Sequence, residues 1–232
     1  MLNAEYGIPV YDHTKEFVHP PDTQSTIIIV RHGKFLNPSG MVYNRDSVMD
    51  KKDWIHLSKE GEEQIQTLAE TIISHKFHVT TIWTSPSSRA KESATILAKT
   101  FGVPDVHIQD MIDDVLSPAP YKQRMTTTQL EELKGDVYSL AKETPLTVAR
   151  RMKQTLVMMS KQLHKGETGV LVSHGDPTAW LLRNIIQGVL PVPKDLHDAF
   201  YLPKAGAAAI FLSDNRIPLA VHFLTDLNEK TY

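Results

Sequence analysis

The chain has 232 residues, of which 41% are hydrophobic and 22% charged, as is typical of a single soluble globular domain. A net charge of −2 excludes a global basic field, so we expect no nucleic-acid partner. The absence of cysteine excludes disulfides, thiolate metal sites and a cysteine nucleophile. No secretory signal and no bilayer-spanning apolar run are found, so we expect a cytoplasmic protein without a membrane partner.

The chain divides into a short polar extension and one larger domain. Residues 1–24 are polar and contain three prolines, and we expect an extension that lies on the surface or is partly disordered. Residues 25–232 are expected to form a single catalytic domain. Within it, residues 115–145 carry loop-like composition with at most one short helix near 128–134, and we expect them to form a lid-like insertion.

Strand and helix signals alternate along this domain. The expected strands cover residues 26–30, 80–84, 106–109, 169–173, 207–212 and 220–224. The expected helices cover residues 58–73, 85–101, 148–163 and 176–187, with Ser58 and Ser85 as helix caps and Gly102 beyond the second helix. The alternation predicts an α/β fold, a three-layer sandwich with a largely parallel central sheet flanked by helices.

Charged and imidazole side chains follow three of the expected strands. Arg31 and His32 end the first strand, Arg89 follows the second, and His174 follows the fourth. Because side chains just beyond the carboxyl ends of parallel strands converge on one crevice, we expect two arginines and two histidines to meet there.

This set of side chains suits a phosphoryl group, which is close to dianionic in a monoester at neutral pH. Planar guanidinium groups bind phosphate oxygens in a bidentate manner, which makes Arg31 and Arg89 the predicted phosphate ligands. A neutral imidazole can attack phosphorus, and we assign this role to His32, held by a turn that Gly33 permits. His174 is expected to donate to the oxygens on which transition-state charge develops.

A leaving alkoxide also needs a proton, which a carboxylic acid at the same crevice could supply. The stretch QDMIDDVLSP (109–118) follows the third strand and offers Asp114, with Asp113 as the alternative. Nearby arginines lower the pKa of such a group, and bound phosphate would offset this by neutralising them.

Four motifs in order resemble the histidine phosphatase superfamily, the phosphoglycerate mutase-like proteins. They are Arg-His-Gly at 31–33, LSKEGEEQ at 57–64, SPSSRAKESA at 85–94 and VSHG at 172–175. The resemblance extends over about residues 26–225. It implies that His32 is the phosphorylated nucleophile, that Arg31, Arg89 and His174 complete the phosphate pocket, and that the acid falls on Asp114.

The chain departs from the family pattern at several positions. Many members have glutamate where this chain has Lys34, and Asn37 lies one position before the asparagine of many members. Asp114 is one methylene shorter than the usual glutamate. We expect Lys34 and Asn37 to bind substrate, and Tyr43 and Arg45 to border it.

The resemblance and the residues together favour a phosphatase that hydrolyses phosphate monoesters without a metal or cofactor. A phosphoglycerate-type mutase is the nearest alternative, and a metallohydrolase and a non-catalytic phospholigand-binding module are the others. A serine hydrolase is disfavoured because no G-x-S-x-G motif occurs. The expected partner is a small phosphorylated substrate or a phosphoprotein, and the sequence leaves its identity and the oligomeric state open.

Overall fold

The computed structural model describes residues 7–17, 19–36, 41–42, 55–115, 125–126, 143–188 and 200–227. The described helices are α2 (Lys59–Ser74), α3 (Ser88–Phe101), α5 (Pro145–Ser160) and α6 (Gly175–Gln187), with one 3-10 turn, η1 (Asp110–Ile112). The described strands are β1 (Val10–Tyr11), β2 (Ser25–Arg31), β3 (Met41–Val42), β4 (His78–Thr84), β5 (Val106–Ile108), β6 (Met125–Thr126), β7 (Glu167–Ser173), β8 (Ala207–Leu212) and β9 (Pro218–Phe223).

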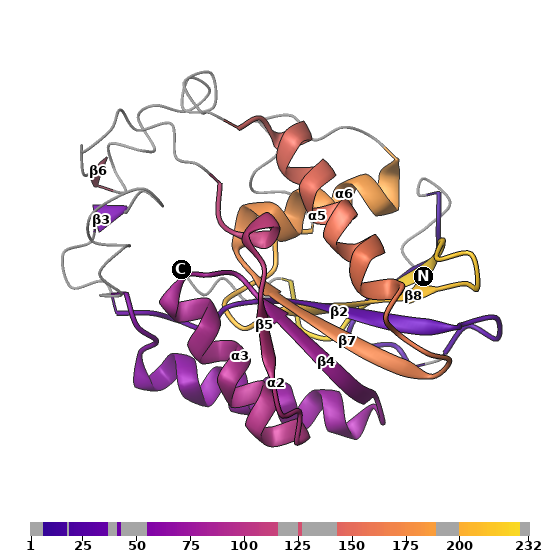
Figure 1. The fold of residues 1–232 in the computed structure, drawn as a ribbon, viewed down its shortest axis with the longest axis horizontal. Helices are drawn as coiled ribbons and strands as arrows, with labels where there is room; N and C mark the ends of the chain where they lie inside the picture. Colours follow the sequence, from indigo (N-terminus) through magenta and orange to yellow (C-terminus); the bar gives the residue numbers. More distant parts are fainter. Residues whose placement is uncertain are drawn as a thin grey trace.

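Seven of these strands form one sheet, in the order β1-β9-β8-β2-β7-β4-β5. Neighbouring pairs show that β8 runs opposite to the other six described strands of this sheet. Helices α2 and α3 cover one face of the sheet, and α5 and α6 cover the other (Figure 1). The predicted three-layer α/β sandwich with a largely parallel sheet is therefore confirmed.

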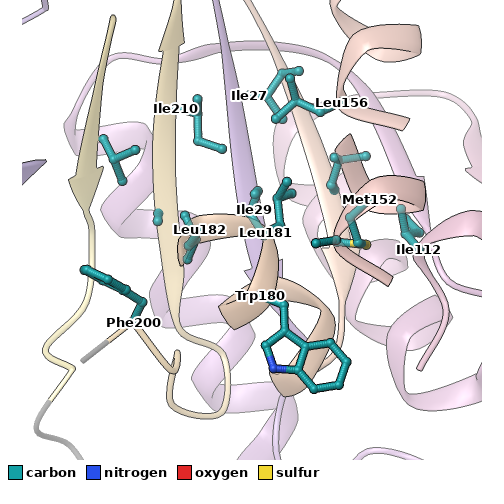
Figure 2. Packing of buried hydrophobic residues seen from close by; sticks show 14 of the residues in the cluster. Ile27, Ile29, Ile112, Met152, Leu156, Trp180, Leu181, Leu182, Phe200 and Ile210 are labelled. Atoms are coloured by element: carbon teal, nitrogen blue, oxygen red, sulfur yellow. The ribbon is translucent and has the colours of Figure 1, made fainter. Parts of the chain in front are cut away.

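The side chains of β2 alternate between two apolar cores. Ile27 and Ile29 pack on the side of α5 and α6, where Leu156 and Trp180 belong to the same cluster (Figure 2). Ile28 and Val30 belong to a second cluster on the side of α2 and α3. All four β2 side chains are fully buried, which explains why this strand reads as a continuous apolar run without alternation.

Local sequence signals account for the ends of several helices. Ser58 caps α2 by accepting a hydrogen bond from the amide of Gly61, as predicted. Gly102 ends α3 with a left-handed φ of 71°, a conformation that glycine adopts without steric cost. Helix α5 begins with a capping box at Thr144 and with Pro145 in its first turn, where a missing N–H costs nothing.

The N-terminal segment is less peripheral than its composition suggests. Val10–Tyr11 form an edge strand parallel to β9, and the side chain of Val10 is fully buried. The ring of Phe17 packs against the ring of His222 on β9, with 4.8 Å between the two ring centroids. The prediction of a surface extension is thus wrong for Val10, because an apolar side chain and the open edge of β9 together stabilise pairing.

Most of the expected lid-like insertion, residues 115–145, lies outside the described residues. Within it, β6 pairs antiparallel with β3, so the segments 34–56 and 115–145 meet through at least one short pair of strands. The lid itself stays a prediction. Across the part of the chain that the structure describes, no helix is both long enough and apolar enough to cross a lipid bilayer.

Candidate active site

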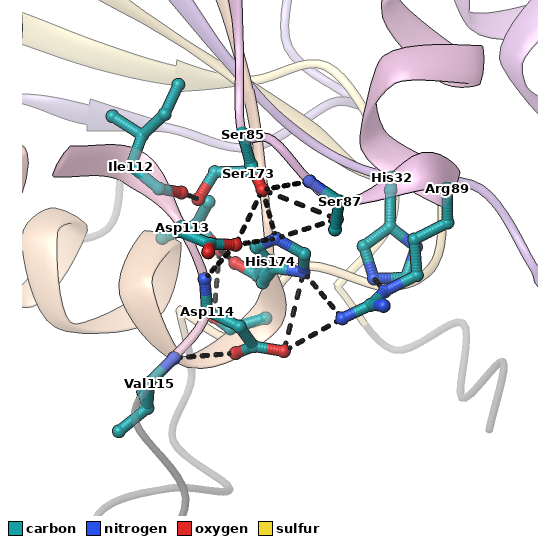
Figure 3. Close-up of polar contacts among 12 residues, drawn as sticks. His32, Ser85, Ser87, Arg89, Ile112, Asp113, Asp114, Val115, Ser173 and His174 are labelled. Carbon is teal, nitrogen blue, oxygen red and sulfur yellow. Dashed lines mark hydrogen bonds and ion pairs between the residues drawn. The ribbon is translucent and has the colours of Figure 1, made fainter. Parts of the chain in front are cut away.

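The two histidines singled out in the sequence lie side by side at the carboxyl ends of neighbouring strands. Strands β2 and β7 are paired in register, with Arg31 opposite Ser173, so the residues that follow them emerge together. The imidazole rings of His32 and His174 are 5.1 Å apart between centroids, and both side chains are buried (Figure 3). The two imidazoles thus meet at the carboxyl edge of the sheet, as expected from the strand ends.

The hydrogen bonds of His32 define which of its nitrogens is free to react. Its Nδ1 lies 2.8 Å from the carbonyl oxygen of Gly33, and a carbonyl only accepts, so Nδ1 carries the proton. The unprotonated Nε2 accepts a hydrogen bond from Nε of Arg89 at 3.2 Å. Burial, and then the charges of Lys204 and Arg89, hold the pKa of His32 well below its usual value, so the ring is neutral.

Gly33 keeps the loop after β2 close to helix α2. A Cβ on Gly33 would lie 2.5 Å from the carbonyl oxygen of Gly61, and a Cβ on Gly61 would overlap the carbonyl of Lys34. Gly33 is not among the described glycines with positive φ. The reason for glycine here is therefore close backbone approach, and the special turn expected from the sequence is absent.

The two arginines are held by different contacts. Arg89, on the first turn of α3, is buried and places Nη2 3.1 Å from Oδ2 of Asp114 and 3.2 Å from Nδ1 of His174 (Figure 3). Arg31 donates from Nη1 to the carbonyl of Leu202 at 2.7 Å, and its guanidinium carbon lies 4.8 Å from the ring centre of Tyr201. Both guanidinium groups are thus fixed before any anion binds.

The two candidate acids, Asp113 and Asp114, occupy different environments. The carboxylate of Asp114 is about a third exposed, with 36% of the side chain accessible, and it contacts Arg89. Burial would raise the pKa of Asp114, but the charges of His174 and Arg89 outweigh this and lower it. Asp113 is only 4% exposed, and hydrogen bonds from His174 and Ser85 hold its pKa well below the usual range despite burial.

Ser85 belongs to this polar group and does not cap a helix. Its hydroxyl lies 2.8 Å from Oδ1 of Asp113 and 2.8 Å from Nε2 of His174. Helix α3 instead begins after Ser87. The prediction that Ser85 caps the helix is wrong, because α3 begins after Ser87 and the Ser85 hydroxyl bonds with Asp113 and His174.

His174 contacts Ser85, Asp113, Asp114 and Arg89. Its pKa is lowered by burial and by Arg89, whereas Asp114 and Asp113 act in the opposite direction. Its backbone carbonyl accepts from the Thr178 amide and begins helix α6. The imidazole is thereby held at a helix N-terminus, where an anion is favoured.

Three further charged or polar residues lie near these histidines and arginines and were not predicted from the sequence. Burial and the charge of Asp114 raise the pKa of Asp176 to about 6, and Asp176 interacts with Tyr201. Burial and the charges of Arg31 and Arg89 hold the pKa of Lys204 well below its usual range. Asp176 could have been suspected because it directly follows His-Gly, whereas only tertiary structure brings in Tyr201 and Lys204.

The remaining predicted substrate ligands have different outcomes. Lys34 donates from Nζ to Oε2 of Glu60 on α2 at 2.6 Å, and both side chains are exposed, so this ion pair lies on the protein surface. Asn37, Tyr43 and Arg45 lie outside the described residues. Among the described residues, no group of three or more histidine, aspartate or glutamate side chains is arranged to hold a metal ion.

Comparison with known families agrees with the geometry of this site. The family model of the histidine phosphatase superfamily (branch 1) matches residues 27–199, which is more than half of the chain. The chain therefore belongs to the histidine phosphatase superfamily, as its motifs indicate. A comparison with curated protein sequences finds no match.

Solved structures show the same fold at low sequence identity. A phosphoserine phosphatase mutant from Entamoeba histolytica, in complex with phosphoserine, is 20% identical with a TM-score of 0.63, over 89% of this chain and 98% of that one. A mycobacterial glucosyl-3-phosphoglycerate phosphatase in complex with VO3 is 17% identical with a TM-score of 0.65, over 87% and 98%. The protein histidine phosphatase SixA, in complex with tungstate, is 12% identical with a TM-score of 0.52, over 85% and 93%.

Proposed function

We propose that this protein hydrolyses phosphate monoesters through a covalent phosphohistidine on His32. The observation that carries the proposal is the neutral His32 ring, with Nδ1 bonded to the Gly33 carbonyl and the Nε2 lone pair facing Arg89. Nε2 attacks phosphorus as the bond from phosphorus to the ester oxygen breaks, and the ester oxygen leaves with the bonding electrons.

Arg31, Arg89 and His174 supply the positive surroundings that this transfer requires. Catalysis of phosphoryl transfer depends mainly on positioning and on donors aimed at the transferred oxygens. Arg89 lies within 3.2 Å of both His32 and His174, so its fork is centred where the phosphoryl group would sit. One preorganised donor of this kind contributes about 3 kcal/mol of transition-state stabilisation.

Asp114 is the proposed proton donor to the leaving oxygen. It is the more exposed of the two carboxylates and lies beside Arg89 at the open side of the group. Without substrate its pKa is lowered by His174 and Arg89, so it is ionised. A bound phosphate dianion offsets the charge of Arg89 and raises the pKa of Asp114, which allows protonation in the complex.

The second half of the reaction returns the enzyme to its starting state. Asp114, now a carboxylate after protonating the leaving group, takes a proton from a water molecule that attacks the phosphohistidine. The nitrogen–phosphorus bond breaks, inorganic phosphate forms, and Nε2 of His32 regains its lone pair. Hydrolysis is favoured over phosphoryl return because the matched structures named above are phosphatases.

The substrate class proposed is a small phosphomonoester or a phosphorylated protein side chain. A phosphoserine phosphatase and a protein histidine phosphatase are both among the similar structures, which supports either class. Release of inorganic phosphate from a panel of both classes would separate them.

The decisive experiment compares the wild-type protein with His32→Ala. We expect the wild-type protein to release phosphate from p-nitrophenyl phosphate and His32→Ala to lose at least about 10³-fold in turnover, because the nucleophile is gone. Rapid mixing with alkaline quenching and intact mass measurement should detect one added phosphoryl group in the wild-type protein only. Equal turnover by both proteins would reject His32 as the nucleophile.

The same assay separates the rival functions. A mutase would require a bisphosphorylated primer, whereas hydrolysis proceeds without it. A non-catalytic binding module would show no phosphate release, and Asp114→Asn would change nothing.

A further inference from the structure

Asp113 and Asp114 are adjacent in sequence yet lie at opposite nitrogens of one imidazole ring. Oδ2 of Asp114 is 3.4 Å from Nδ1 of His174, and Oδ1 of Asp113 is 3.4 Å from Nε2 (Figure 3). The ring therefore has an inner side, toward Asp113, and an outer side, toward Asp114 and Arg89.

The hydroxyl of Ser85 determines where the protons on the inner side lie. A carboxylate only accepts hydrogen bonds, so the Ser85 hydroxyl donates its single proton to Oδ1 of Asp113 at 2.8 Å. The same hydroxyl oxygen is then an acceptor for Nε2 of His174, also at 2.8 Å. Nε2 of His174 must carry a proton, which leaves Nδ1 to accept from Nη2 of Arg89 in the unliganded protein.

Asp113 is held firmly in this position. Its side chain is 6% exposed, against 36% for Asp114, and Oδ1 also accepts from the amide of Asp114 at 2.8 Å. Arg151 on α5 donates to the carbonyls of Asp113 at 2.7 Å and Asp114 at 3.2 Å, and pairs with Glu143. A buried carboxylate fixed at both side chain and backbone is poorly placed to follow a leaving group out of the site.

We propose that Asp113 is a positioning residue that fixes the Nε2–H tautomer of His174 and stabilises its imidazolium when a phosphoryl group binds. This inference rests on the proposed function. The imidazolium then donates from Nδ1 to a phosphoryl oxygen and keeps its proton throughout, and the proton enters from solvent with the substrate. Asp113 acts through His174, whereas Asp114 protonates the leaving group.

The charges around His174 support this division of roles. The groups that face the ring are Asp113 and Asp114 after η1, Arg89 on α3 and His32 after β2. Arg89 opposes protonation of the ring, while both carboxylates raise the pKa of His174. When bound phosphate engages Arg89, Asp113 remains as the buried carboxylate paired with Nε2.

The test compares Asp113→Asn with Asp114→Asn on two esters, p-nitrophenyl phosphate and an alkyl phosphate. For Asp113→Asn we expect turnover to fall about tenfold or more on both esters alike. The reason is that losing a close carboxylate lowers the pKa of the His174 imidazole by about one unit or more. The alkaline limb of its kcat profile should move to lower pH by that amount. For Asp114→Asn the loss should be small on the nitrophenyl ester and large on the alkyl ester.

Ser85→Ala is the matched control, because it removes the bridging hydroxyl and keeps the carboxylate. Its alkaline limb should move less than that of Asp113→Asn. An Asp113→Asn loss that grows with the pKa of the leaving alcohol, or an unmoved alkaline limb, would overturn the proposal. Wild-type protein that releases no phosphate would instead reject the proposed function itself.

A measurement on the wild-type protein reports the tautomer of His174 directly. Nitrogen NMR of labelled histidine, assigned with His174→Gln, should show proton on Nε2 and a lone pair on Nδ1 of His174 without ligand. Adding inorganic phosphate should protonate Nδ1. An Nδ1–H tautomer in the free protein would contradict the assignment of Asp113, whatever the kinetics show.

Discussion

Among the described residues, histidines gather in two regions, and only one of them resembles an active site. The first is the pair His32 and His174 at the carboxyl ends of β2 and β7. The second, which we call the Phe17 cluster, consists of six neighbouring rings in tilted or edge-to-face contact: Phe17, His19, His75, Phe77, Phe211 and His222.

The histidine pKa values are lowered in both regions, so this property does not distinguish them. In the Phe17 cluster, burial is the leading cause, and it lowers the pKa of His222 to about 4. In the first region burial also leads, but Lys204 and Arg89 act on His32, and Arg89 contacts both rings. Fixed guanidinium groups and carboxylates, rather than perturbed imidazoles, therefore distinguish the proposed active site.

The largest effect is expected from replacing Arg89, whose guanidinium contacts both His32 and His174. Arg89→Lys keeps the charge but loses the fork that contacts His32, His174 and Asp114. We expect kcat for p-nitrophenyl phosphate to fall about 10²-fold or more, which steady-state kinetics would measure. A fall of less than about threefold would show that any cation suffices.

The Phe17 cluster should affect stability instead of turnover. The pKa of His222 is about 4 in the folded protein and about 6.5 unfolded, so protonation favours unfolding. Its contribution is complete above about pH 6.5 and is lost as pH falls toward 4, a change of about 3 kcal/mol. His222→Phe cannot be protonated, so its unfolding free energy in urea should fall less than that of the wild-type protein between these pH values.

His222→Phe also serves as the control for Arg89→Lys. It should leave kcat within about twofold of wild type, because the Phe17 cluster contacts neither His32 nor His174 in the part of the chain the structure describes. Identical acid sensitivity of the two proteins, or a large loss of turnover in His222→Phe, would remove the distinction between the regions.

The smallest effect is expected at Lys34, which lies beside the catalytic loop but pairs with solvent-exposed Glu60. Lys34→Ala should change kcat/KM by less than about twofold and stability by less than about 1 kcal/mol, as for an exposed ion pair. Kinetics with p-nitrophenyl phosphate and thermal unfolding would check both. A tenfold rise in KM would restore Lys34 as a substrate ligand.

The sequence by itself determined the layers of the fold and the four basic residues of the proposed phosphate pocket. The apolar run of β2 and the capped helix α2 can be predicted from the sequence, because both depend on the pattern of neighbouring residues. Motifs at strand ends identified Arg31, His32, Arg89 and His174, because the residues that follow parallel strands lie at the same edge of the sheet.

Only the tertiary structure decided what surrounds those residues. It placed two adjacent aspartates at opposite nitrogens of His174, and it showed Ser85, an expected helix cap, bridging Asp113 and His174. It also placed Tyr201 and Lys204, which precede β8, close to the site residues, and it showed that Lys34 pairs with Glu60. Such contacts join segments far apart in sequence, and the direction of one side chain among several allowed rotamers follows from packing, which local patterns do not encode.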